Sequence, residues 1–176
     1  MTENMPLVGV LMGSDSDFDT MRPCFETLQK FDVAFEARVI SAHRTPERAI
    51  EYSKTARERG LKVIIAGAGA AAHLAGVIAS STTLPVLGVP ISATSLQGFD
   101  ALLATVQMPG GVPVATFAVG SAGATNAALF AIQIISTSDE TLALKFKDFK
   151  DEMPNKVGKK DEKLQTKIAE FLKNNE

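Results

Sequence analysis

Ser41-Ala42-His43-Arg44-Thr45-Pro46 joins an alternating stretch that ends at Ile40 to a stretch with helical spacing. The alternation before this turn predicts a strand, and the spacing after it predicts an amphipathic helix. Pro46 suits the first position of that helix, because its missing N–H is not needed there. The segment therefore connects a strand to a helix, which is the unit that builds a parallel sheet with helices on its faces.

The same turn carries groups that suit catalysis. His43 is one of only two histidines in the chain, and Arg44 follows it directly. A histidine gives or takes a proton near neutral pH, and a guanidinium binds a phosphate through two parallel hydrogen bonds. Open α/β sheets bind their ligands at the carboxyl ends of the strands, where this turn lies. The sequence thus predicts an active site for a phosphorylated substrate.

The rest of the chain repeats the pattern. We expect strands at residues 7–12, 33–40, 62–66, 85–89 and 114–119, and helices at 16–31, 46–59, 71–80, 95–106 and 122–136. Helical connections favour parallel pairing, and continuous apolar strands are typical of a sheet covered on both faces. The predicted fold is a three-layer α/β/α sandwich. Pro23 falls inside the first helix, where it either kinks the helix or marks a later start.

Residues 139–176 differ in composition from residues 1–138. Half of the eighteen Lys and Arg residues lie after Leu144, mixed with acidic residues. We expect two exposed helices at 139–151 and 160–173, separated by a segment with Pro154 and Gly158. We therefore divide the chain into a catalytic domain (1–138) and a C-terminal helical extension (139–176). Apolar residues at helical spacing predict that one face of the extension docks on this subunit or on a neighbouring one; they are Leu164, Ile168, Phe171 and Leu172.

Composition excludes several classes of function. The net charge of −2 and the absence of Trp argue against a nucleic-acid-binding surface. A single cysteine excludes a disulfide framework and a multi-cysteine metal site, and no H-E-x-x-H segment exists, so we expect no metal. The uncharged stretches 63–79 and 112–136 are long enough for membrane spans but divide into a strand, a glycine turn and a helix. With no signal-peptide pattern in residues 1–6, we expect a cytoplasmic protein.

The distribution of charge predicts self-association. Between Val63 and Ser138 the only charged residue is Asp100. Surface helices normally present one charged face, and three predicted helices in this span lack one. A single domain of this size cannot cover them all. We therefore expect an obligate homo-oligomer.

Two further turns follow strands and are rich in small residues. Residues 13–17 read Gly-Ser-Asp-Ser-Asp and open the first helix, where free N–H groups and hydroxyls can hold a phosphate, although Ser and Asp are also ordinary helix caps. Residues 67–73 let a ligand approach the backbone closely and end in His73, which is alternatively a hydrogen-bonded core residue. The loops 107–113 and 120–126 are also rich in small or turn-forming residues, and each suits either a pocket or ordinary packing. The chain has neither a P-loop nor a G-x-S-x-G motif. The chemistry that we therefore expect is proton transfer by a histidine on a small molecule.

In this order, six segments closely resemble the class I N5-carboxyaminoimidazole ribonucleotide mutases of bacterial purine biosynthesis. They are GSDSD (13–17), SAHRTP (41–46), AGAGAAAHLAG (66–76), LPVLGVP (84–90), VQMPGGVPVAT (106–116) and AGATNAAL (122–129). The resemblance implies a flavodoxin-like fold, an octamer, and a C-terminal helix that reaches a neighbouring subunit. It also implies that the substrate is handed over by an ATP-dependent carboxyaminoimidazole ribonucleotide synthetase.

The resemblance further implies the reaction and the site. N5-carboxyaminoimidazole ribonucleotide becomes 4-carboxy-5-aminoimidazole ribonucleotide through bound carbon dioxide and aminoimidazole ribonucleotide, without metal, biotin, ATP or any other cofactor. His43 matches the catalytic histidine that moves a proton between N5 and C4. Ser14 and Arg44 match phosphate-binding positions, and Asp17 matches a position that binds the ribose hydroxyls. The turn of residues 67–73 would line the carbon dioxide pocket. The other expected substrate-binding residues are Ser16, Ser41, Gly69 and His73.

The chain departs from the family in the third turn, and two other functions stay open. Ala70 stands where the family usually has Gly, and Ala75 where it has Pro, which bears on the shape of the pocket. One alternative is a class II aminoimidazole ribonucleotide carboxylase that uses free carbon dioxide; the segment around His73 resembles class I instead. The other is a non-catalytic nucleotide-binding module, in which His43 and Arg44 would have no task.

Overall fold

Apolar strands form the centre of the computed structural model, which describes residues 5–174. β1 (Val8–Met12), β3 (Val63–Gly69) and β4 (Val86–Ile91) are buried along most of their length, whereas β2 (Phe35–Val39) and β5 (Ala115–Thr116) lie at the two edges. All neighbouring strands are parallel, in the order β2-β1-β3-β4-β5. This is the flavodoxin-like strand order, and it confirms the predicted fold class.

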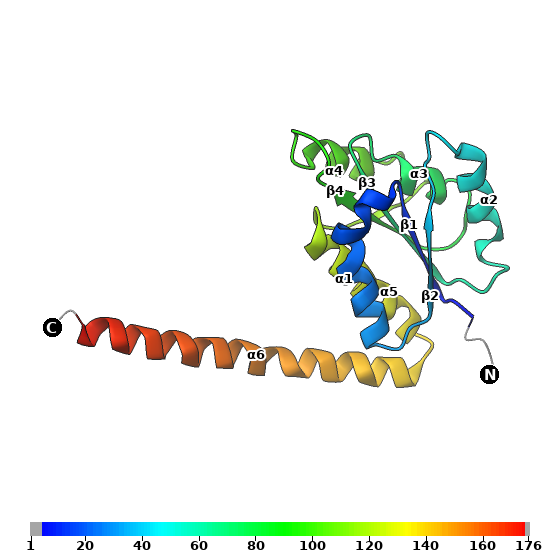
Figure 1. Cartoon of the computed structure of the whole chain (residues 1–176). Helices are drawn as coiled ribbons and strands as arrows, with labels where there is room; N and C mark the ends of the chain where they lie inside the picture. Colours follow the sequence, from blue (N-terminus) through cyan, green and yellow to red (C-terminus); the bar gives the residue numbers. More distant parts are fainter. Residues whose placement is uncertain (1–4, 175–176) are drawn as a thin grey trace. The chain divides into compact units, whose positions relative to one another are not determined.

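Helices follow each strand and cover the sheet (Figure 1). They are η1 (Asp15–Asp17), α1 (Phe18–Lys30), α2 (Pro46–Ala56), α3 (Leu74–Ala79), α4 (Phe99–Val106) and α5 (Ser121–Ser136). α1 begins well before Pro23, so this proline does not mark a later start of the helix. α4 begins later than expected, because Gly98 adopts φ = 85° immediately before it and interrupts the helical backbone. α3 also begins late, after a turn in which Ala70 has φ = 53°.

Parallel pairing places the functional turns at one edge of the sheet. The carboxyl ends of β1, β2 and β3 are in register, with Met12 opposite both Val39 and Gly67. One layer of the core packs α2 and α3 against these strands through side chains such as Leu11, Ile64 and Ile78. Each large apolar side chain buried in this way contributes roughly 1.5–3 kcal/mol to stability. The turns that follow the three strands are therefore supported by a packed layer.

The contacts of the chain divide it into two compact units, Met1–Ile135 and Ser136–Glu176. In the second unit, α6 runs without a break from Glu140 to Lys173, so the expectation of two separate helices was wrong. Pro154 removes a hydrogen bond and costs roughly 3 kcal/mol in a helix interior, but a break would require a second costly helix nucleus. The Asp139 carboxylate caps the helix at the Leu142 N–H (2.9 Å), and an ion pair between Lys156 and Glu152 (3.3 Å) spans the proline.

No helix in the described range, residues 5–174, has the length and apolar character needed to cross a bilayer. The expectation about a signal peptide concerns residues 1–6, of which residues 1–4 lie outside the described part of the chain.

Candidate active site

The turns after β1, β2 and β3 enclose a pocket of about 390 Å³. Every residue that the sequence indicated for the site lines it: Ser14, Ser16, Asp17, Ser41, His43, Arg44, Gly69 and His73. These residues come from three separate segments, and the parallel register of the strands brings them together. The pocket lies at the carboxyl edge of the sheet, where open α/β folds bind their ligands.

The first turn combines a helix cap with polar groups that face the pocket. Ser14 accepts a hydrogen bond from the Ser16 N–H (3.3 Å), and the Asp17 carboxylate accepts one from the Ser14 N–H (3.1 Å), which together form a capping box. The hydroxyls of Ser14 and Ser16 lie 2.9 Å apart. The residues that form the helix cap thus also line the pocket.

Asp17 is a charged group that the fold largely buries, with 8% of its surface exposed. Burial raises the pKa of its carboxyl group, and the hydrogen bond from the Ser14 backbone opposes this rise. A desolvated carboxylate is a strong hydrogen-bond acceptor, because water no longer competes for its oxygens. Asp17 therefore suits the recognition of hydroxyl groups on a ligand.

The second turn is held together by its own hydrogen bonds. Thr45 Oγ1 donates to the Ser41 carbonyl (2.9 Å) and accepts from the Ser41 N–H (3.2 Å). Ser41 Oγ in turn accepts from the backbone N–H of Arg44 (3.2 Å). Ser41 thus shapes the turn as well as lining the pocket.

Arg44 extends from this turn toward the first one. Its Nη2 lies 3.4 Å from the Gly13 carbonyl, and its side chain is exposed to the pocket. Within residues 5–174 no carboxylate forms an ion pair with it. An unneutralised guanidinium beside a helix N-terminus is well suited to bind a phosphate.

The third turn approaches the ligand space with its backbone. A Cβ on Gly69 would lie 2.5 Å from Ala93 Cβ and 3.0 Å from the Ile91 carbonyl oxygen, so only glycine fits there. The following residue, Ala70, has a positive φ of 53°, a conformation that glycine adopts more readily. His73 stands immediately before α3.

The two histidines of the chain contact each other across the pocket. His43 Nε2 lies 2.9 Å from His73 Nδ1, and the ring centroids are 4.9 Å apart in an edge-to-face arrangement. One of the two nitrogens must carry the proton that the other accepts. The contact is favourable when one ring or neither is charged, and unfavourable when both are. The pair can therefore hold one exchangeable proton within reach of a ligand.

Sequence reasoning missed part of the pocket wall. Ala93, from the connection between β4 and α4, lines the pocket, although this connection was not singled out. Its position after β4 could have indicated it, because ligands bind beyond the carboxyl ends of the strands and this holds for every strand of the sheet. The loops 107–113 and 120–126 contribute none of the pocket's lining residues. In the described part of the chain, no three His, Cys, Asp or Glu side chains are grouped to hold a metal ion.

Comparison with known proteins yields consistent similarities. The family model for AIR carboxylase matches residues 7–156. N5-carboxyaminoimidazole ribonucleotide mutase of Bacillus subtilis is 59% identical over 140 residues, which cover 80% of this chain and 86% of that protein. The Thermotoga maritima protein of the same name is 48% identical over 173 residues, covering 98% and 100%. The crystal structure of Treponema denticola PurE matches with a TM-score of 0.80 and 28% identity, over 90% of this chain and 98% of that one.

Proposed function

This chain belongs to the AIR carboxylase family, and we propose that it acts there as an N5-carboxyaminoimidazole ribonucleotide mutase of de novo purine biosynthesis. The enzyme moves a carboxylate from N5 to C4 of the aminoimidazole ring and yields 4-carboxy-5-aminoimidazole ribonucleotide. The observation that carries the proposal is a single pocket that combines His43, Arg44 and Asp17. Proton transfer, phosphate binding and hydroxyl recognition can all occur there on one nucleotide.

The pocket suggests how the nucleotide binds. Arg44 and Ser14 hold the phosphate, because a cation and a hydroxyl meet there at the start of a helix. Asp17 accepts hydrogen bonds from the ribose hydroxyls. The imidazole ring then lies toward His43 and the third turn, which ends in His73.

The reaction proceeds through trapped carbon dioxide. The bond between N5 and the carboxylate carbon breaks, carbon dioxide is released into the pocket, and protonated His43 gives its proton to N5. The carbon of carbon dioxide then bonds to C4, and the proton displaced from C4 returns to His43. The small residues around Gly69 hold the carbon dioxide and exclude water that would compete for it. Atoms and protons balance, so His43 ends as it began.

We also propose an assembly of several subunits, as the family resemblance implies in the form of an octamer. Large apolar side chains are exposed on α4 and α5, namely Phe99, Leu103, Val106 and Phe130. These helices carry almost no charge, so a second copy is a suitable cover for them. In the same assembly the extension 139–176 packs on a neighbouring subunit through Leu164, Ile168 and Phe171, which are exposed on α6. Hand-over of substrate from the synthetase and a cytoplasmic location belong to this proposal as well.

A direct assay tests the proposed reaction. Purified protein is given either N5-carboxyaminoimidazole ribonucleotide or aminoimidazole ribonucleotide with ambient carbon dioxide, and 4-carboxy-5-aminoimidazole ribonucleotide is measured. We expect fast conversion of the first substrate, and product from the second only at high bicarbonate. Efficient turnover of the second at ambient carbon dioxide would instead identify a direct carboxylase, and nucleotide binding without product from either would identify a non-catalytic module.

A further inference from the structure

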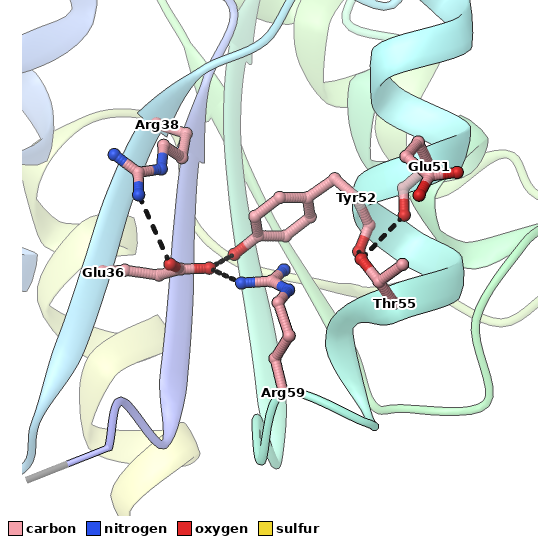
Figure 2. A network of polar contacts seen from close by, with 6 residues as sticks. All are labelled: Glu36, Arg38, Glu51, Tyr52, Thr55 and Arg59. Carbon is pink, nitrogen blue, oxygen red and sulfur yellow. Dashed lines mark hydrogen bonds and ion pairs between the residues drawn. The ribbon is translucent and has the colours of Figure 1, made fainter.

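A second polar cluster lies outside the pocket, between β2 and α2 (Figure 2). The Glu36 carboxylate accepts a hydrogen bond from the Tyr52 hydroxyl (2.7 Å) and pairs with Arg59 Nη1. The Arg59 guanidinium also stacks on the Tyr52 ring, 4.5 Å from its centroid. Arg38 completes the cluster at 3.7 Å from the other Glu36 oxygen. Three elements of the chain, namely β2, α2 and the turn after α2, are thereby joined at one carboxylate.

The backbone of β1 leaves room for this cluster. A Cβ on Gly9 would lie 2.2 Å from the Tyr52 hydroxyl oxygen, and Gly9 is paired in register with Glu36. The Tyr52 hydroxyl thus reaches Glu36 through the space that a side chain at Gly9 would occupy. Burial alone would raise the pKa of Glu36, but the hydrogen bonds from Arg59 and Tyr52 outweigh it and lower the pKa. The carboxylate therefore stays charged, and the cluster stays paired, at neutral pH.

The cluster spans the turn that carries the proposed catalytic groups. Glu36 lies on β2 and Tyr52 on α2, and the chain between these two elements is the turn of residues 40–45. Because Thr45 and Ser41 bond within the turn, its residues move together with the start of α2. The contact of Arg44 with the first turn is long, at 3.4 Å, and so holds the turn only weakly. The start of the turn is held by the Ile40 N–H, which donates to the Met12 carbonyl (2.9 Å), and His43 contacts His73. The end of the turn is held by the placement of α2 against β2.

We propose that Tyr52 is a positioning residue for the reaction: through Glu36 and Arg59 it holds α2 against β2 and thereby places His43 and Arg44 at the pocket. This inference rests on the proposed function. It assigns a task to a cluster whose residues do not line the pocket. It also explains why a polar hydroxyl is brought through the space above Gly9 to a partly buried carboxylate.

The first test replaces Tyr52 by Phe, which keeps the ring and removes the hydroxyl. The matched control is Ile132→Val, which trims a fully buried side chain of α5 that does not line the pocket. We expect Tyr52→Phe to raise KM about three- to tenfold and to lower kcat, since Arg44 and His43 move together. The control should lose stability while keeping both constants. Equal kinetic changes in both variants would reduce Tyr52 to a structural role and overturn the proposal.

A double-mutant cycle sharpens the test. If Tyr52 acts through Arg44, then Tyr52→Phe will weaken binding of aminoimidazole ribonucleotide in the wild-type background and have little effect in an Arg44→Ala background. Additive losses in the two backgrounds would overturn the proposal. Arg59→Lys, which keeps the charge but loses the planar group stacked on Tyr52, serves as the second variant if Tyr52→Phe does not fold.

Hydrogen exchange separates this inference from the proposed function. Amides of residues 41–45 should exchange several-fold faster in Tyr52→Phe than in the wild type or in Ile132→Val, whether or not the protein turns over the nucleotide. Unchanged exchange in this turn would overturn the positioning role alone. Absence of nucleotide turnover by the wild-type protein, with faster exchange in the variant, would overturn the proposed reaction and leave the mechanical link in place.

Discussion

Replacement of Ala70 by Gly should stabilise the protein, although it removes a methyl group. Ala70 has φ = 53°, and a left-handed conformation costs a residue with a Cβ about 1–2 kcal/mol. Glycine avoids this cost but loses more backbone freedom on folding, about 0.5–1 kcal/mol. The two ranges differ by about 0–1.5 kcal/mol, and their midpoints differ by a gain of roughly 0.75 kcal/mol in the free energy of unfolding. For a chain of this length, that gain raises the melting temperature by about 1–4 °C.

The neighbouring residue provides a control with the opposite sign. Ala71 is exposed and is not among the residues with positive φ, so Ala71→Gly should lose about 0.5–1 kcal/mol of stability. Both variants are compared with the wild type by urea unfolding and by thermal melting at one protein concentration. If Ala70→Gly melts below the wild type, or if the two variants shift together, the strain argument at Ala70 is wrong.

Four other substitutions or truncations test the site and the assembly. His43→Asn should bind nucleotide nearly normally but turn over about 10²–10⁴-fold more slowly; a loss of only a few-fold would remove His43 from the proton transfer. Arg44→Ala should weaken nucleotide binding about ten- to a hundredfold in a titration at constant ionic strength, and an unchanged affinity would place the phosphate elsewhere. Because folding lowers the pKa of Glu36, its contribution to stability is present above the unfolded value near pH 4.5 and is lost as the pH falls through the folded value. Glu36→Gln should therefore destabilise at pH 7, and its difference from the wild type in urea unfolding should shrink as the pH falls below 4.5; an equal loss at every pH would rule out the charge as the cause. Truncation before Lys160 removes apolar side chains worth roughly 1.5–3 kcal/mol each when buried, so the protein should sediment as smaller species and melt earlier, whereas a fully assembled and active truncated chain would show that the tail is dispensable.

The order of strands and helices was predictable because it follows from the local spacing of apolar residues. The alternation before Ile40 and the helical spacing after Pro46 each depend on residues a few positions apart, and the structure has β2 and α2 on the two sides of the turn. Parallel pairing follows from the helical connections. The boundaries were less predictable, since a single backbone angle, such as that of Gly98, decides where α4 begins.

The helix of the C-terminal unit shows where local signals fail. Pro154 and Gly158 are both unfavourable in a helix interior, and they led to the prediction of a break. α6 continues through both residues because helix formation is cooperative. Extending an existing helix past an unfavourable residue costs less than ending it and nucleating a second helix. A breaking residue has to be weighed against the length and capping of the whole helix.

By itself, the sequence determined which residues could meet at the site, and only the tertiary structure decided how they meet. The rule that ligands bind at the carboxyl ends of parallel strands was enough to bring His43, Arg44 and Asp17 to one edge of the sheet. The 2.9 Å contact of His43 with His73 and the burial of Asp17 depend on strand register and on packing between segments far apart in the chain. The hydrogen bond from Tyr52 to Glu36 also depends on packing, because a side chain at Gly9 on β1 would occupy the position of the Tyr52 hydroxyl. Periodicity is a property of neighbouring residues, whereas these contacts arise only when separate elements pack together.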